Sequence, residues 1–273
     1  MQTMPEAIKA RRSVRTFDGN PLTSDDFHAI ADIVEDACNP FGVGVDFRVL
    51  DAASNNLKSP AIVGETCYAA AKVHRVKNFE IAFGYAFERF CLQAQAKGFG
   101  TVMLAASLNR EAFERAMELS PDEVMPVATP IGRAAEKQSV RERAMRRALG
   151  ADGRLPFDEL FFRGSFYTPL APVDSGALEL LLEAVRLAPS AGNKQPWRAV
   201  VAGDDANTVH FYEARSMKDS PLGDIQKVDV GIALAHFDLV AQELGISVEF
   251  VQSDPGIAVP DNVAYIMSCK VVR

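Results

Sequence analysis

Two short stretches of this 273-residue chain combine residue types that bind anions and flat polar rings. The first, Arg11-Arg12-Ser13-Val14-Arg15, brings three guanidinium groups and one hydroxyl together in five residues. Guanidinium groups hold phosphates through paired hydrogen bonds, and a serine hydroxyl adds a neutral donor. The segment therefore predicts an anion site, and a solvated charged surface is the alternative that so short a motif leaves open.

The second stretch is Pro189–Trp197, with the sequence PSAGNKQPW. Its serine, asparagine and glutamine both donate and accept hydrogen bonds, while Gly192 and the two prolines predict an irregular backbone with exposed amides. Such a loop suits the edge of a flat heterocycle with a polar rim. The alternative is a polar connection from a helix to a strand. A serine nucleophile elbow is excluded, because Ala188–Gly192 lacks the first glycine and follows a helix instead of a strand.

Composition excludes several other classes of protein. The chain has 29 basic and 36 acidic side chains, a net charge of −7, which favours a small anionic ligand over a nucleic acid. Its four cysteines form no CxxC pair and its four histidines lack metal-ligand spacing, so neither a disulfide scaffold nor a metal site is predicted. The sequence shows no secretory signal and no apolar run of membrane-spanning length, so we expect a cytoplasmic protein without membrane contact.

Helices and strands are predicted from hydrophobic periodicity and capping signals. The expected helices are residues 3–11, 23–37, 79–97, 109–119, a helix over 178–185 capped by Asp174, and 228–244. The expected strands are residues 45–51, 98–104, 124–131, 197–202, 246–251 and 263–272.

The pattern G-x-A…L-x-A…G occurs twice, at residues 84–98 and 231–245. Each copy lies in a predicted long helix that follows a helix, a turn and a strand. Chance packing of small residues between helices is the alternative, but the shared order of elements favours a duplication. We therefore predict two related halves, residues 1–163 and 164–273, packed about a pseudo-twofold axis.

Together these segments resemble the FMN-dependent nitroreductase superfamily, in its single-chain, internally duplicated branch. The resemblance rests on RRSVRTFDG (11–19), NFEIAFGYAFER (78–89), GFGTVMLAAS (98–107), TPIGRAAEK (129–137), RLPFDELFF (154–162), EAVRLAPSAGNKQPWR (183–198) and DVGIALAHFDLVAQELG (229–245). It implies an α+β fold, with a nitroreductase-like mixed sheet flanked by helices and FMN between two halves packed as a pseudodimer.

The resemblance also implies which residues contact the flavin. Arg11 and Ser13 are expected at the ribityl phosphate region, with Arg12 in the same binding segment, and Arg15 at the N1–O2 edge. Arg154 is expected to neutralise the phosphate. The residues expected to cover the isoalloxazine are Pro189, Ser190, Ala191, Asn193 and Gln195. Those expected to offer backbone amides toward N5 and O4 are Met103, Leu104, Ala105 and Ala106.

Two departures from the family pattern affect these expectations. Residues 102–106 lack the tryptophan and glycines that are usual there, which leaves the choice of substrate open. Asp152 stands where a second basic residue often precedes Arg154, so the basic segment 133–147 is an alternative source of charge for the phosphate.

The resemblance implies an FMN-dependent NAD(P)H nitroreductase-like oxidoreductase. NAD(P)H would transfer a hydride to the flavin, leave, and be replaced by a nitroaromatic or quinone acceptor in a ping-pong reaction. Another flavin chemistry, such as reductive dehalogenation or flavin breakdown, and a non-catalytic flavin-binding or sensing protein are the alternatives. No catalytic side chain is assigned, because the flavin carries the chemistry.

We expect one FMN per chain, in a composite site that needs no second chain. The stretch RGSFYTPL, residues 163–170, opens the second half and has no counterpart of R-R-S-x-R, and the first half has ACNPFGVGV where P-S-x-x-N-x-Q-P-W would be needed. Residues 164–273 also hold eight basic against 14 acidic side chains, which disfavours a second phosphate there. A monomer is therefore a sufficient state for binding.

Overall fold

The structure, a computed structural model, describes residues 2–272 of the chain. They form two compact units, with the boundary between Ala151 and Asp152. The boundary predicted from the sequence lies after residue 163. Strand β5 (Phe161–Arg163), however, pairs in parallel with β7 (Trp197–Val201), so residues 152–163 belong with the second unit.

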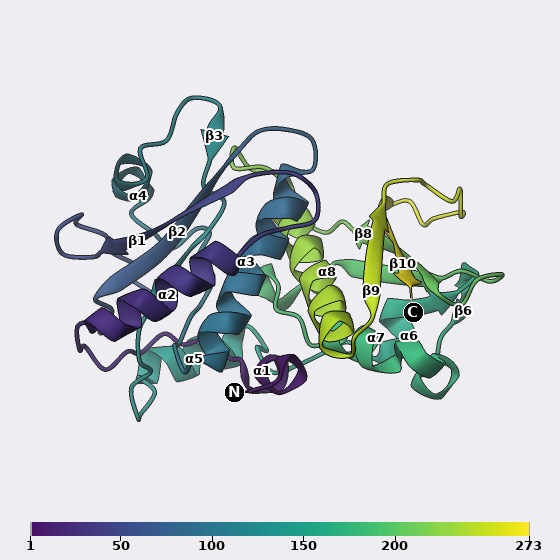
Figure 1. The fold of residues 1–273 in the computed structure, drawn as a ribbon, viewed down its shortest axis with the longest axis horizontal. Coiled ribbons are helices and arrows are strands. Elements are labelled where there is room, and N and C mark those ends of the chain that lie inside the picture. The colour runs from purple at the N-terminus through teal and green to yellow at the C-terminus, as the bar shows by residue number, and fades with distance from the viewer. Residues whose placement is uncertain (1, 273) are drawn as a thin grey trace. The chain divides into compact units, whose positions relative to one another are not determined.

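The first unit is built on a small sheet whose central strand is β2 (Cys67–His74). It pairs antiparallel with β1 (Val45–Asp51), β3 (Glu123–Val124) and β4 (Ala128–Ile131). The middle of β2 is three alanines, residues 69–71, that are completely buried and allow neighbouring elements to approach closely. Figure 1 shows α2 (Ser24–Asp36) lying across one face of β1 and β2.

The helices of the first unit, besides α2, are α1 (Met4–Ala10), α3 (Phe79–Ala96), α4 (Arg110–Ala116) and α5 (Val140–Ala148). Of the helices in this unit, α1, α2 and α5 begin at a side-chain cap. Capping boxes open α1, through Thr3 and Glu6, and α2, through Thr23 and Asp26, as the sequence predicts. Phe47 of β1 stacks on α3, with ring centroids 5.6 Å from Phe87 and 5.3 Å from Phe90.

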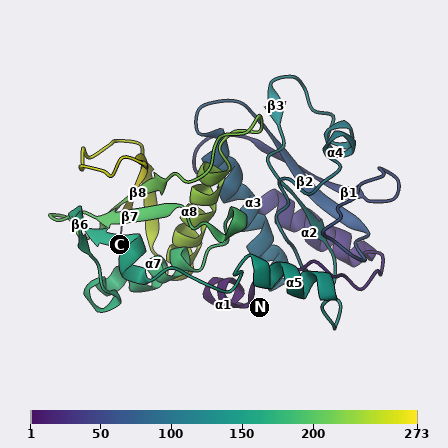
Figure 2. The ribbon, with the colours of Figure 1, turned by 180° about the vertical axis from the view of Figure 1, so that it is seen from behind.

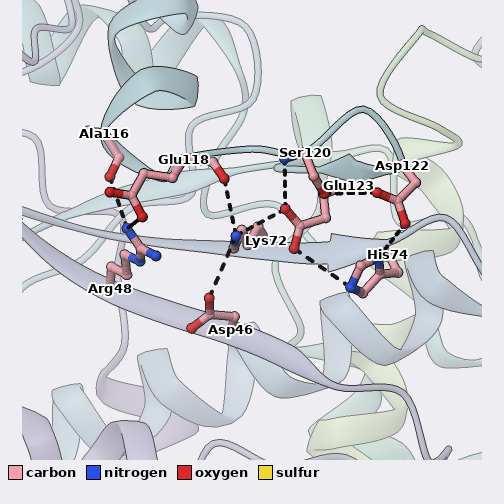
Figure 3. Close-up of polar contacts among 9 residues, drawn as sticks. All are labelled: Asp46, Arg48, Lys72, His74, Ala116, Glu118, Ser120, Asp122 and Glu123. Atoms are coloured by element: carbon pink, nitrogen blue, oxygen red, sulfur yellow. Dashed lines mark hydrogen bonds and ion pairs between the residues drawn. The ribbon is translucent and has the colours of Figure 1, made fainter.

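Polar contacts attach the short strand β3 to β2 (Figure 3). Lys72 Nζ donates to Glu123 Oε2 at 3.0 Å, and Ser120 N donates to the same oxygen at 2.9 Å. His74 Nδ1 lies 2.8 Å from Asp122 Oδ2 and His74 Nε2 lies 3.7 Å from Glu123 Oε1. Because β3 has only two residues, these side chains supply much of its attachment.

The second unit contains a six-stranded sheet in the order β6-β5-β7-β8-β10-β9. Its remaining strands are β6 (Ser165–Pro169), β8 (Thr208–Ala214), β9 (Ser247–Val251) and β10 (Val263–Val272). Its helices are α6 (Phe157–Leu160), α7 (Glu179–Arg186) and α8 (Ile225–Glu243). Apart from β5–β7, the neighbouring strands pair antiparallel. Figure 2 shows β7 and β8 side by side, with α7 and α8 beside them.

Three predictions about elements are wrong. Residues 98–104 form isolated bridges at Gly100, Thr101 and Leu104, not a strand. Residues 124–131 divide into β3 and β4, with Pro126 between them. Asp174 does not cap the helix after it, because two 3₁₀ turns, Pro172–Asp174 and Gly176–Leu178, precede α7.

The α+β class and the helices flanking the sheets are confirmed. Each unit also contains a helix, an antiparallel strand pair and a long helix in the same order: α2-β1-β2-α3 in the first and α7-β7-β8-α8 in the second. That order is what a duplication predicts, and the duplication itself stays a prediction. Within residues 2–272, no helix is long and apolar enough to cross a membrane, and no group of His, Cys, Asp and Glu is arranged to hold a metal ion.

Candidate functional site

The arginine motif is an extended segment that begins where α1 ends. Arg11 is the C-cap of α1, with φ −61° and ψ 129°, and its amide donates to Ala7 O. Val14 N donates to Thr101 O at 2.9 Å and Ser13 bridges Thr101, so the motif runs beside Gly100 and Thr101. Gly100 permits this approach, because a Cβ there would lie 2.9 Å from the Val14 side chain.

The first two arginines of the motif face carboxylates of the same unit. Arg11 Nε lies 3.8 Å from Glu88 Oε1 of α3, and the Glu88 side chain is completely buried. Arg12 Nη1 donates to Glu142 Oε1 of α5 at 2.8 Å. Part of the positive charge that the sequence assigns to phosphate binding is thus already balanced inside the protein.

Arg15 is different, because its side chain is buried at 8% exposure without a full set of partners. Nε and Nη1 of Arg15 are buried and have no hydrogen-bond partner among residues 2–272. Burial lowers the pKa of Arg15, and nearby Glu142 partly offsets that shift. Buried donors left unpaired cost free energy, so this guanidinium is suited to a ligand that brings acceptors, as the N1–O2 edge of a flavin does. The residues present therefore fit FMN.

Residues 103–106 come shortly after Gly100 and Thr101, the two residues that lie beside the arginine motif. The Leu104 amide is already used, since it donates to Ala128 O at 2.8 Å, and the Leu104 side chain packs into the core of the first unit. Ala105 O accepts from Arg110 Nη2 at 2.6 Å, while Ala106 is exposed. Of the four amides expected to face a flavin, that of Leu104 is therefore engaged within its own unit.

The loop of the second unit has a constrained backbone. After Ser190, Gly192 (φ 57°), Asn193 (φ 55°) and Gln195 (φ 49°) lie in the left-handed region, which side chains other than glycine rarely adopt. Ser190 Oγ accepts from Gln195 N at 2.8 Å and closes the turn. Backbone strain of this kind persists where surrounding contacts impose it, and functional loops are common locations for it.

Side chains of the loop bind the segment 153–155 of the same unit. Gln195 is buried, and its Oε1 accepts from Leu155 N at 2.9 Å. Asn193 Nδ2 donates to Gly153 O at 3.0 Å, and Arg154 Nη1 lies 3.4 Å from Asn193 Oδ1. Arg154 Nη2 also donates to Leu187 O at 3.2 Å. The structure thus brings three expected site residues, Arg154, Asn193 and Gln195, together, and it gives Gln195 a structural role.

A buried carboxylate beneath this loop escaped the sequence analysis. Both oxygens of Asp229, in the first turns of α8, accept from Ala191 N, at 3.0 and 3.1 Å. Burial raises the pKa of Asp229 well above its usual range, and the charges of Asp224 and Glu213 raise it further. No sequence signal marks Asp229, because one acid in an apolar helix has the same pattern whether it faces a loop or solvent.

A second missed residue is Glu142, which sequence analysis counted only within a basic surface segment. Its position could have been found from Ser139-x-x-Glu142, the pattern of a helix start. Ser139 does cap α5 and accepts from Glu142 N at 3.1 Å. The Glu142 side chain, however, turns away from Ser139 N and binds the arginine motif.

Comparison with known proteins agrees with the resemblance. Residues 3–241 match a family model described as "Putative TM nitroreductase". The crystal structure of a protein described as a putative nitroreductase from Thermotoga maritima is 20% identical and has a TM-score of 0.61, covering 98% of this chain and 94% of that one, which supports the fold. A protein named NADH dehydrogenase from Thermus thermophilus is 41% identical over 73 residues, which are 25% of this chain and 36% of that protein. The match thus spans about a third of that relative's length. Because the family model covers most of the sequence, this chain belongs to the nitroreductase family that the model describes.

Proposed function

We propose that this protein is an FMN-dependent oxidoreductase that takes electrons from NAD(P)H and reduces a nitroaromatic or quinone-type acceptor. The observation that carries the proposal is Arg15, a buried guanidinium in the arginine motif with two nitrogen atoms, Nε and Nη1, that lack partners among residues 2–272. Membership of the nitroreductase family supports it. The 73-residue likeness to a protein named NADH dehydrogenase is compatible with the choice of donor.

The residues proposed to hold the cofactor are among those that the family resemblance implies. Arg11 and Ser13 bind the phosphate region, and Arg15 binds the N1–O2 edge. Arg154 contributes charge toward the phosphate. The loop residues proposed to cover the ring are Pro189, Ser190, Ala191 and Asn193. The amides of Met103, Ala105 and Ala106 remain proposed contacts, while Leu104 and Gln195 act by shaping the backbone.

FMN, when bound, supplies hydride transfer between NAD(P)H and an acceptor that occupy the site in turn. Arg15 places a fixed positive charge where negative charge grows on reduction, and its burial keeps water from screening that charge. The left-handed backbone at Gly192, Asn193 and Gln195 holds the loop in one shape. Side chains of this chain therefore bind, orient and stabilise charge, and none is assigned a proton transfer.

The test is to purify the protein, denature it and identify the released cofactor by chromatography. We expect FMN, because the arginine motif suits a terminal phosphate monoester; recovery of FAD, or of no flavin after incubation with FMN, would contradict the proposal. NADH or NADPH is then added without oxygen, and the flavin absorbance is followed with time. Reduction much faster than that of free FMN supports an enzyme, whereas an equal rate favours a flavin-binding or sensing protein.

A further inference from the structure

The arginine motif is held in place by one buried carboxylate. The Glu142 side chain is 1% exposed, and its Oε1 accepts from Arg12 Nη1 at 2.8 Å. Its Oε2 accepts from Arg15 N at 3.2 Å and from the Thr16 hydroxyl at 2.8 Å. Three residues that are close in sequence therefore converge on a single side chain from a helix more than 120 residues away.

The chain on either side of Glu142 follows the same segment. Ala135 N donates to Thr16 O at 3.0 Å, Asp18 N donates to Arg133 O at 3.1 Å, and Ser139 N donates to Thr16 Oγ1 at 3.1 Å. We refer to residues 133–142 as the clasp. Residues 133–139 of the clasp fix the backbone that follows Arg15. Glu142, the last residue of the clasp, fixes the backbone of Arg15 itself.

The charge of the Glu142 carboxylate explains why its partners are arginines and hydrogen-bond donors. A carboxylate as buried as Glu142 is costly unless cations and hydrogen-bond donors surround it. Arg12 supplies a direct ion pair, and Arg15 supplies both an amide donor and a nearby positive charge. The Arg12 guanidinium is thus paired with a carboxylate of the protein. By contrast, Nε and Nη1 of Arg15 have no partner among residues 2–272.

Building on the FMN site proposed above, we propose that Arg12 and Glu142 are a positioning pair. Their ion pair holds residues 12–16 in the conformation that presents the Arg15 guanidinium to the flavin, and Arg12 does not itself bind the cofactor. The basic segment 133–147 then contributes to the site through its one buried acid, not through its exposed arginines.

The test is a double-mutant cycle on the affinity of the flavin-free, full-length protein for FMN. Arg12→Ala and Glu142→Ala should each weaken binding about tenfold, because either change frees the same segment. The double variant should also lose about tenfold, since the two residues act through one contact. Arg12→Lys should recover most of the affinity, because lysine can still pair with Glu142. Glu136→Ala and Arg143→Ala, exposed positions on the same segment, should bind as wild type does.

Binding is measured well below each variant's melting temperature, and circular dichroism verifies folding. Glu142→Gln, which keeps the side-chain length, replaces Glu142→Ala if the latter does not fold. A loss of about a hundredfold in the double variant would mean that Arg12 contacts FMN directly and would overturn the positioning pair. So would wild-type affinity in the Glu142 variants. Failure of the wild-type protein to bind FMN would instead overturn the proposed function, and the pair's role with it.

Discussion

The guanidinium of Arg15 combines two properties that normally exclude one another, burial and unmet hydrogen-bonding capacity. A hydrogen bond to a charged group contributes about 1.5–3 kcal/mol. We expect Arg15→Met, which keeps an apolar stem, to weaken FMN binding by roughly ten- to a hundredfold. The stability of the flavin-free protein should fall little, because the substitution removes a buried charge with unpaired donors.

Titration of the flavin-free protein with FMN, followed by flavin fluorescence, measures this effect. Arg15→Lys is the matched variant: it retains the charge but not the forked geometry, and we expect an intermediate affinity. Wild-type affinity in Arg15→Met would remove Arg15 from the site. A collapse of stability without FMN would show instead that Arg15 is needed for the fold.

Individual residues differ in how far sequence could assign them. Arg11–Arg15 and Pro189–Trp197 stand out because they concentrate polar groups, and a sequence displays concentration directly. Glu142 and Asp229 are acids in helices without a binding motif around them, and their roles depend on which loop packs against them. The contact between Gln195 and Leu155 N is likewise invisible in sequence, because the loop's unusual backbone creates it.

At the scale of elements, the two-residue strand β3 should detach in acid. The hydrogen bond from Ser120 N and, next, that from Lys72 lower the pKa of Glu123 to about 2 from its usual 4.5 (Figure 3). A carboxylate with a lowered pKa in the folded state stabilises the fold above its unfolded pKa and loses that contribution as the pH falls. We therefore expect stability to decline between about pH 4.5 and pH 2.

The variant Glu123→Gln isolates this contribution, because its side chain does not titrate. At pH 6 it should melt at a lower temperature than the wild type, and the difference should shrink as the pH falls toward 2. Glu118→Gln, at a side chain that is 74% exposed, is the matched control and should follow the wild type. A constant difference between Glu123→Gln and the wild type across this range would contradict the prediction.

The region where β8 meets the start of α8 should have the opposite pH dependence. Burial, followed by the charge of Asp224, raises the pKa of Glu213 to about 7. A carboxyl group with a raised folded pKa is protonated in the folded state while the unfolded chain has already lost its proton. Stability should therefore fall as the pH rises from about 4.5 to about 7, and then level off.

Urea unfolding between pH 5 and pH 8 measures this slope. Glu213→Gln, which stays neutral and can still donate to Asp224, should flatten it and should be more stable than the wild type at pH 8. Because the effect lies above pH 4.5, it is separate from that of Glu123. An unchanged slope in Glu213→Gln would assign the pH dependence to another group.

Elements with a capping signal or a clear hydrophobic period were the more predictable ones. The capping boxes at Thr3 and Thr23 act within four residues, so sequence is sufficient to place α1 and α2. Buried strands such as β2 and β8 lack the alternation of a half-exposed strand, and no prediction was made for them. Residues 98–104 have the composition of a strand, but they pair with two different segments. Thr101 bridges the arginine motif at Ser13, while Gly100 and Leu104 bridge Gly132 and Ala128, so only isolated bridges form.

At the scale of the whole molecule, the family and the α+β class followed from motif order, because order along the chain survives where local structure is ambiguous. The number of flavins is a separate question. R-R-S-x-R occurs once, in the first unit, and P-S-x-x-N-x-Q-P-W occurs once, in the second. If the chain arose by duplication, each half has kept one of the two motifs. We therefore predict one FMN per chain and full binding by a single chain.

Flavin absorbance against protein concentration gives the number of FMN molecules per chain, and light scattering of the same sample gives the number of chains per particle. We expect a ratio of one that stays constant when dilution separates any oligomer. Disabling either motif alone, with Arg15→Met in one protein and Asn193→Ala in another, should weaken binding in each. An equimolar mixture of these two variants should not recover wild-type affinity, because each chain then has one defective motif of its own. Recovery in the mixture would show that motifs from different chains combine, and a ratio of two would show that each unit binds FMN by itself.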